Sequence, residues 1–166
     1  MMTLENAPPS LEVYAPPSRL PAGHPTPVLV IDDEPAGAAT TLGWLAGAGY
    51  PTAAESDGDA VLRLVRTEVM RLVVSELYIP CGEGACVVTA LKQDRTRLPR
   101  LRVLVHTRHT AAADDAWALA AGCDALLHKP ASAAACVREV RRLDGGEPGE
   151  PESDAGDAGD AAGGAP

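Results

Sequence analysis

Short, continuous runs of apolar residues recur through the middle of the chain, and each is long enough for one buried strand. Their short length and their content of Val, Ile and Leu favour strands over helices. We expect strands at 28–31, 72–74, 101–105 and 125–128, with a weaker one at 50–54.

Helix-like stretches separate these runs. Asp57 and Ser132 are typical N-caps, Pro35 suits a first helical turn, and Gly122 is typical of the residue that ends a helix. The predicted helices follow Pro35 and Asp57, span about 85–92 and 111–121, and run from Ser132 to Leu143. Five strand–helix units in alternation predict an α/β, doubly wound fold with a parallel sheet covered on both faces.

The two ends of the chain differ in composition from this middle part. Residues 1–26 contain six prolines and no apolar period, and residues 145–166 are mostly Gly, Ala, Pro and acids. Neither segment can bury enough apolar surface to offset the entropy of ordering it. We therefore expect one folded domain at 27–144, between two disordered tails.

Charge and hydropathy narrow the class of protein further. The formal net charge is −9, but residues 145–166 alone carry six acids and no base. The folded part is nearly balanced, which argues against a nucleic-acid footprint. No window approaches the length of an apolar membrane span, and the first residues lack the pattern of a secretory signal. We expect a cytoplasmic protein that binds neither nucleic acid nor membrane.

Polar side chains follow the carboxyl ends of the predicted strands, where ligands bind in sheets of this kind. Asp32 and Asp33 follow the first strand and Glu76 follows the third, while Thr107 and Lys129 follow the fourth and fifth. Carboxylates gathered at one edge repel one another unless a hard cation such as Mg²⁺ binds them. Each residue taken alone is best interpreted as a solvated polar group at the end of a strand, but the set taken together favours a functional site.

The order and spacing of these residues resemble the receiver domain of bacterial response regulators. The matching motifs are the run from Val28 to Pro35, Ile79-Pro80 followed by Gly84, Thr107, and Gly122-Cys123-Asp124 leading to Lys129-Pro130. The resemblance covers about 27–144 and implies a (βα)₅, CheY-like and flavodoxin-like fold with strand order 2-1-3-4-5. It also implies a role in two-component signalling, in which a histidine kinase phosphorylates an aspartate at the end of the third strand.

The resemblance implies a Mg²⁺ site at this edge of the sheet. Asp32 and Asp33 match the acidic pair that holds the metal, and Glu76 stands at the acceptor position beside them. Tyr78 matches the residue whose backbone carbonyl is a further ligand.

The resemblance also implies contacts to a phosphoryl group. Thr107 matches the hydroxyl residue that moves toward the phosphoryl oxygens, and Lys129 matches the lysine that pairs with them. Pro130 matches the proline that commonly follows this lysine in a cis peptide.

Three departures from the family pattern fall on the site itself. Glu76 stands where the family has the phosphoacceptor aspartate, four residues before Pro80. Arg108 replaces the small residue that admits the phosphoryl group, and Leu126 replaces the aromatic switch residue. A glutamate carboxylate reaches about 1 Å further than that of aspartate, and such a displacement costs about 10²-fold in rate. We therefore expect a degenerate receiver in which Mg²⁺ binding is weak or lost.

Two versions of this hypothesis stay open. In one, Glu76 reaches Lys129 and mimics the phosphorylated state; in the other, the pocket is a relic in which they form a structural ion pair. Either way we expect a stand-alone receiver-like protein, because residues 145–166 cannot fold into a DNA-binding domain. It would act through contact with a sensor histidine kinase or a downstream regulator, with Trp117 and Leu126 as the candidate partner surface.

Two other functions remain as alternatives. One is a working phosphoacceptor in a phosphorelay, with Glu76 or another acid as the acceptor. The other is an enzyme on a flavodoxin-like scaffold, since a fold alone does not fix function. It ranks last because residues 33–35 replace a Gly-rich phosphate loop, and because His106, His109 and His128 have no nucleophile partner. We expect no enzymatic activity and no organic cofactor, and we interpret these histidines as surface or strand-end residues.

Basic residues crowd the stretch before and along the fourth predicted strand. They are Lys92, Arg95, Arg97, Arg100, Arg102 and Arg108. The stretch lacks the aromatic residues and the reading helix of a nucleic-acid site. We interpret it as a solvated loop or as a docking patch for an acidic partner or the acidic tail.

Overall fold

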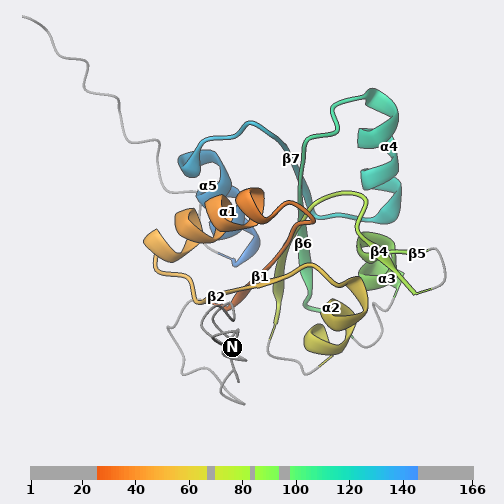
Figure 1. The fold of residues 1–166 in the computed structure, drawn as a ribbon, viewed down its shortest axis with the longest axis horizontal. Coiled ribbons are helices and arrows are strands. Elements are labelled where there is room, and N and C mark those ends of the chain that lie inside the picture. The colour runs from red at the N-terminus through yellow and green to blue at the C-terminus, as the bar shows by residue number, and fades with distance from the viewer. Residues whose placement is uncertain (1–25, 67–69, 83–84, 94–97, 146–166) are drawn as a thin grey trace, which may run out of the picture.

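The computed structural model describes residues 26–66, 70–82, 85–93 and 98–145, which form a five-stranded parallel sheet with helices on both sides (Figure 1). The strands of this sheet are β1 (Val28–Ile31), β2 (Thr52–Glu55), β3 (Leu72–Ser75), β6 (Arg102–Thr107) and β7 (Ala125–His128). Their order is β2-β1-β3-β6-β7, which is 2-1-3-4-5 when only the strands of this sheet are counted. The predicted fold class and strand order are confirmed.

The helices of the described residues cover the two faces of the sheet. They are α1 (Pro35–Gly47), α2 (Gly58–Val65), α3 (Val87–Gln93), α4 (Ala112–Ala121) and α5 (Ala133–Leu143). Helices α1 and α5 lie on one side of the strands, and α2, α3 and α4 lie on the other (Figure 1). The sheet therefore separates two hydrophobic clusters.

Strand β1 shows how the sequence supplies both clusters. Leu29 and Ile31 belong to the cluster beneath α2 and α3, whereas Val28 and Val30 belong to the cluster beneath α1 and α5. All four side chains are buried. A strand that is covered on both faces has no solvent-facing positions, which explains its unbroken apolar run.

The ends of three helices follow their sequence signals. Asp57 caps α2 by accepting a hydrogen bond from the N–H of Asp59 at 2.9 Å, and Ser132 caps α5 by accepting from the N–H of Ala135 at 3.1 Å. Gly122 follows α4 with φ of 90°, a left-handed conformation that glycine adopts without a steric penalty.

Two boundaries differ from the prediction. The weak strand starts at Thr52, because Tyr50 is buried in the cluster beneath α1 and the carbonyl of Pro51 already accepts the N–H of Val28. Helix α3 starts two residues late, because Ala85–Cys86 forms strand β5 and pairs antiparallel with strand β4 (Pro80–Cys81). Pairing between two-residue strands leaves no periodic signal in the sequence.

The predicted tails lie almost wholly outside the described residues, so the domain boundaries at 27 and 144 stay predictions. Within the described ranges, none of the helices is long and apolar enough to cross a bilayer.

Candidate functional site

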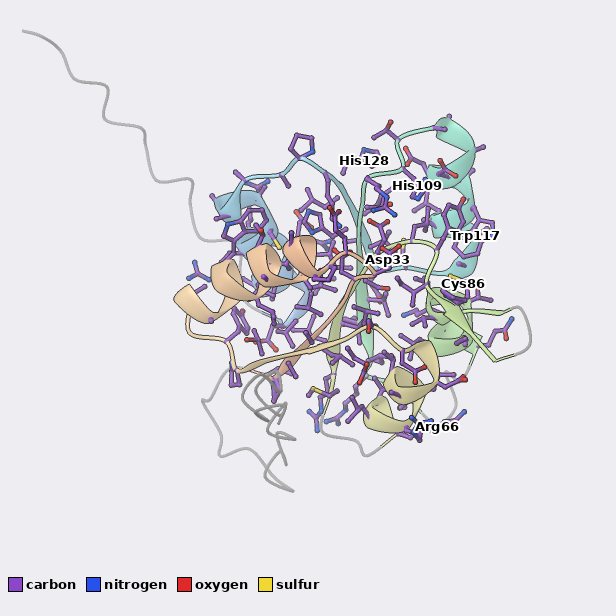
Figure 2. All side chains as sticks on the ribbon, in the orientation of Figure 1. Asp33, Arg66, Cys86, His109, Trp117 and His128 are labelled. Atoms are coloured by element: carbon purple, nitrogen blue, oxygen red, sulfur yellow. The ribbon has the colours of Figure 1, made fainter. Side chains whose placement is uncertain are left out.

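The carboxyl ends of β1, β3 and β6 meet at one edge of the sheet. The parallel register aligns Ile31 with Ser75 and Ser75 with Val105. Asp32 and Glu76, which follow β1 and β3, therefore lie side by side, and the N–H of Glu76 donates to the carbonyl of Ile31 at 2.8 Å. Asp33 is at the same edge, with His109 and His128 nearby (Figure 2).

Glu76 is 3% exposed, and hydrogen-bond donors surround both of its carboxylate oxygens. Oε1 accepts from the hydroxyl of Thr107 and from the N–H of Leu77, the latter at 2.8 Å. Oε2 accepts from Nζ of Lys129 at 3.1 Å and from the N–H of Arg108 at 3.3 Å. Because a carboxylate offers about four lone-pair sites, these donors leave it little capacity for another partner.

The charge states of Glu76 and Lys129 follow from their hydrogen bonds. Burial opposes ionisation of Glu76, but the hydrogen bonds from Thr107, Leu77 and Lys129 outweigh burial and hold its pKa below the usual range. Burial also opposes the charge of Lys129, but its bonds to Asp32 and Glu76 raise its pKa above the usual value. Both shifts favour a carboxylate paired with an ammonium.

Lys129 also holds Asp32, the first acid of the pair after β1. Its Nζ lies 2.7 Å from Oδ2 of Asp32, and Oδ1 accepts the N–H of Glu34 at 2.9 Å. Gly37 lets the first turn of α1 approach this carboxylate, because a Cβ at that position would lie 2.6 Å from Oδ2. The peptide bond between Lys129 and Pro130 is cis.

Arg108 is the counter-ion of the two outer acids. Its Nη2 lies 3.3 Å from Oδ2 of Asp33, and its Nη1 lies 3.5 Å from Oε2 of Glu34. The three side chains are each about half exposed, unlike the buried pair behind them. Because its backbone N–H donates to Glu76, Arg108 connects the outer acids to the buried carboxylate.

The acids at this edge do not fit a metal ion as they stand. The ligands expected from the sequence are Asp32, Asp33, Glu76 and the backbone carbonyl of Tyr78. The structure pairs the three acids with basic side chains, Lys129 or Arg108. Within the described part of the chain, no three His, Cys, Asp or Glu side chains are arranged to hold a metal ion. The role of the Tyr78 carbonyl stays a prediction.

The side chain of Tyr78 forms an aromatic cluster that the sequence did not predict. Its hydroxyl donates to Oδ1 of Asp114 at 2.5 Å, and its ring meets that of His109 edge-on with centroids 4.8 Å apart. The ring of Trp117 lies 5.4 Å from that of Tyr78, and Figure 2 shows Trp117 on α4. The cluster joins the loop after β3 to α4. Trp117 and Leu126 are half-buried against the core, and their role as a partner surface stays a prediction.

His106 lies near the end of β6 but is not a surface histidine, because it is 4% exposed. Its Nδ1 lies 3.5 Å from Oγ1 of Thr41, and its ring lies 6.2 Å from that of Trp44. Burial lowers its pKa to about 4, and within the described residues its Nε2 has no hydrogen-bond partner. His128, in contrast, ends β7, and its Nε2 lies 2.8 Å from Oδ1 of Asp115.

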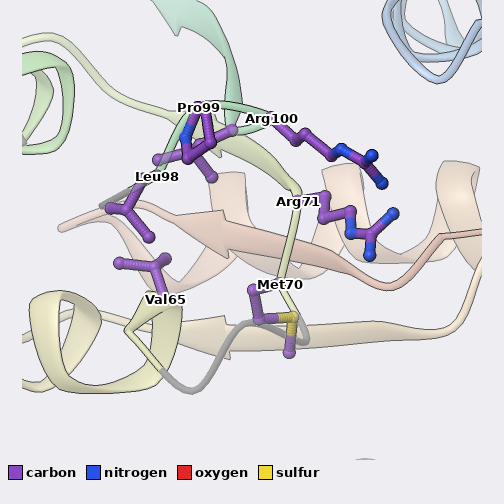
Figure 3. A pocket seen from close by; sticks show the side chains of 7 residues that line it. Val65, Met70, Arg71, Leu98, Pro99 and Arg100 are labelled. Carbon is purple, nitrogen blue, oxygen red and sulfur yellow. The ribbon is translucent and has the colours of Figure 1, made fainter. Parts of the chain in front are cut away.

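Among the described residues, the basic stretch includes side chains with carboxylate partners, Lys92 and Arg108 among them, and the interpretation of the stretch as a solvated loop or docking patch stays a prediction. Lys92 is buried and its Nζ lies 2.8 Å from Oδ2 of Asp124, while Arg108 lies at the acidic edge. Arg100 lines a cavity of about 230 Å³ at the amino ends of β3 and β6 (Figure 3). The other lining residues are Val65, Met70, Arg71, Leu98, Pro99 and Leu101. Arg95 and Arg97 lie outside the described residues.

Comparison with known proteins gives the same family for the sequence and the fold. Residues 28–141 match the response regulator receiver domain. The chain is 34% identical over 119 residues to the transcriptional activator protein ExaE of Pseudomonas putida, an alignment that covers 70% of this chain and 54% of that protein. This chain spans about half the length of the curated relatives it matches. It belongs to the response regulator receiver family.

Solved receiver domains share the fold. The signal receiver domain of response regulator NarL from Mycobacterium tuberculosis matches with a TM-score of 0.64 and 25% identity, covering 75% of this chain and 99% of that one. The receiver domain of sensor histidine kinase PA1611 from Pseudomonas aeruginosa PAO1 matches with a TM-score of 0.64 and 20% identity. The match covers 73% of this chain and 98% of that one. The latter structure has a magnesium ion coordinated in its active-site cleft.

Family membership places this domain in two-component signalling, in which receiver domains interact with histidine kinases. Its role is signalling rather than catalysis in the usual sense.

Proposed function

We propose that this domain is a degenerate receiver in which the Glu76 carboxylate takes the place of the phosphoryl group. The domain then acts by contact with a protein partner, without being phosphorylated. The observation that carries this proposal is the set of four donors on the two oxygens of Glu76. Family resemblance assigns two of them, Thr107 and Lys129, to the phosphoryl oxygens, and here both already bind the glutamate.

Geometry also argues against phosphoryl transfer to Glu76. In-line transfer requires a nucleophile with free approach to phosphorus and donors available for the transferred oxygens. Both oxygens of Glu76 are engaged, and the hydrogen bonds that lower its pKa also make the carboxylate a weaker nucleophile. The guanidinium of Arg108 also contacts the outer acids Asp33 and Glu34, where the family resemblance places the metal that assists transfer. Three features thus oppose the same step.

The carboxylate of Glu76 reproduces only part of the negative charge of a phosphoryl group. A carboxylate carries one negative charge, whereas a phosphoryl group carries about −1.5 to −2 at neutral pH. The two oxygens of Glu76 nevertheless engage a hydroxyl, an ammonium and two backbone N–H groups. We therefore propose one fixed conformation of the loop after β6, held by Thr107 and Arg108. The expectations of a stand-alone protein and of a cytoplasmic location stay predictions.

The test is intact-mass analysis after incubation with acetyl phosphate and Mg²⁺. The natural chain should gain no phosphoryl group. The double variant Glu76→Asp, Arg108→Ala should be labelled. An aspartate at position 76 is shorter and leaves the four donors available to a phosphoryl group, and an alanine at position 108 removes the guanidinium from Asp33 and Glu34. The matched control Glu76→Asp, Arg102→Ala keeps Arg108 and should be labelled less.

Two results would contradict the proposal. Labelling of the natural chain that is lost in Glu76→Gln would make it a working phosphoacceptor in a phosphorelay. Absence of labelling in the Glu76→Asp, Arg108→Ala variant would show that these donors do not form a phosphoryl site. The pair of Glu76 and Lys129 would then be a structural relic.

A further inference from the structure

We infer that Arg108 is the built-in cation of this edge of the sheet, and that it occupies the outer acids in place of a divalent metal ion. This inference goes beyond the proposed role of Glu76 and does not depend on it. It starts from the finding that the outer acids already have a cationic partner. Asp33 and Glu34 both contact the guanidinium of Arg108.

The geometry suits a guanidinium rather than an ammonium. Two different nitrogens, Nη2 and Nη1, each contact a different carboxylate, at 3.3 and 3.5 Å. The planar fork of arginine presents several donors in fixed directions, so one side chain serves both acids. An exposed ion pair alone would be loosely held. Here the backbone N–H of Arg108 is fixed by Glu76 at 3.3 Å, which positions the side chain over the acids.

The charges at this edge are divided between two cations. Lys129 contacts the two buried acids, Asp32 and Glu76, and Arg108 contacts the two exposed ones, Asp33 and Glu34. Each cation thus serves two carboxylates. A divalent ion that approached the outer acids would meet the positive charge of Arg108, and it would have to displace the guanidinium to gain carboxylate ligands.

Removal of Arg108 should therefore create an affinity for divalent ions that the natural chain lacks. Mn²⁺ is a suitable probe, because the electron paramagnetic resonance signal of the free ion falls when it binds. The natural chain should leave Mn²⁺ free. Arg108→Ala should bind one equivalent at least tenfold more tightly than the natural chain. Arg108→Lys, which keeps the charge without the fork, should lie between them.

The matched control is Arg102→Ala. It removes the same charge from the opposite end of β6, where Arg102 lies 3.7 Å from Asp124 and not near the outer acids. This variant should leave Mn²⁺ free, like the natural chain. A second readout is thermal unfolding, in which Mn²⁺ should stabilise Arg108→Ala and leave the natural chain unchanged. Because the Arg108 side chain is half exposed, its truncation should not prevent folding.

Two outcomes would overturn the inference. One is stoichiometric binding of Mn²⁺ by the natural chain with the affinity of Arg108→Ala, and the other is no gain in affinity in Arg108→Ala. Neither result depends on phosphoryl labelling of the natural chain. The inference and the proposed function can therefore fail separately.

Discussion

Nζ of Lys129 lies 3.1 Å from Oε2 of Glu76, although the two residues are 53 positions apart in the sequence. The sheet brings them together, because each follows the carboxyl end of a parallel strand. The side chains of Glu76 and Lys129 are 2% and 18% exposed, so water solvates neither fully. The stability of the domain is therefore tied to the residue at position 76.

Glu76→Gln should destabilise the domain by about 2 kcal/mol at neutral pH, because it leaves Lys129 partly buried with one carboxylate partner fewer. The measurement is urea denaturation. The control is Glu139→Gln, which weakens a contact of 2.9 Å with Arg142 on the surface of α5 and should cost less than about 0.5 kcal/mol. Equal losses in the two variants would show that the buried pair contributes no more than a surface pair.

His106 should make the domain less stable as the pH falls below about 6.5. Its folded pKa of about 4 lies below the ordinary value of 6.5, so the unfolded chain binds the proton more readily and stability falls with pH. Burial is the main cause; Lys129 lowers the pKa further, while Glu76 and Asp32 oppose the shift. The loss should reach about 2 kcal/mol at pH 5 and level off below about pH 4.

The measurement for His106 is urea denaturation from pH 7 to pH 5, compared with His106→Met. In His106→Met, the fall in unfolding free energy between pH 7 and pH 5 should be mostly absent, because the variant keeps every other titrating group of the natural chain. A slope that persists unchanged in His106→Met would assign the effect to another group.

Gly37→Ala should destabilise the domain although it places a better helix former in α1. Its Cβ would lie 2.6 Å from Oδ2 of Asp32, so the carboxylate held by Lys129 has to move. Gly43→Ala and Gly47→Ala are matched controls in the same helix, because nothing lies within 4 Å of their added Cβ atoms. These two should stabilise the domain by up to about 1 kcal/mol in thermal unfolding. If Gly37→Ala behaves as they do, Asp32 is not held tightly.

Tyr78→Ala should shift the fluorescence of Trp117 to longer wavelength, because the tyrosine ring 5.4 Å away shields the indole from water. The measurement uses a Trp44→Phe background so that Trp117 is the remaining tryptophan, excited selectively over the tyrosines. Leu119→Ala serves as the control, since Leu119 is 63% exposed and two positions along the helix point to nearly opposite sides. An unchanged spectrum in Tyr78→Ala would mean that the aromatic cluster does not persist in solution.

The fold could be predicted because its signals are local. Apolar runs such as 28–31 are long enough for one strand, and capping residues such as Asp57 and Ser132 mark where helices begin. His106 was missed, although β6 carries the signal: Val103 and Val105 face one cluster, while Leu104 and His106 alternate with them. Continuing that alternation by one residue would have placed the histidine inside.

The contacts of the site could not be predicted in full, because several involve groups without a sequence signature. The N–H groups of Leu77 and Arg108 bind Glu76, and every residue except proline has such a donor. Arg108 and Asp33 are 75 positions apart, and their pairing depends on the path of the loop after β6. The resemblance indicated a steric role for Arg108 and gave no sign of its charge partner.

A permanent carboxylate at position 76 changes what determines how long a signal lasts. A phosphoryl group on an aspartate is added by a kinase and lost by hydrolysis, so its lifetime sets how long a signal lasts. The charge of Glu76 is part of the covalent chain, and it lasts as long as the protein does. In the state proposed here, the duration of the signal is set by synthesis and degradation of the domain, and its strength by the number of copies present.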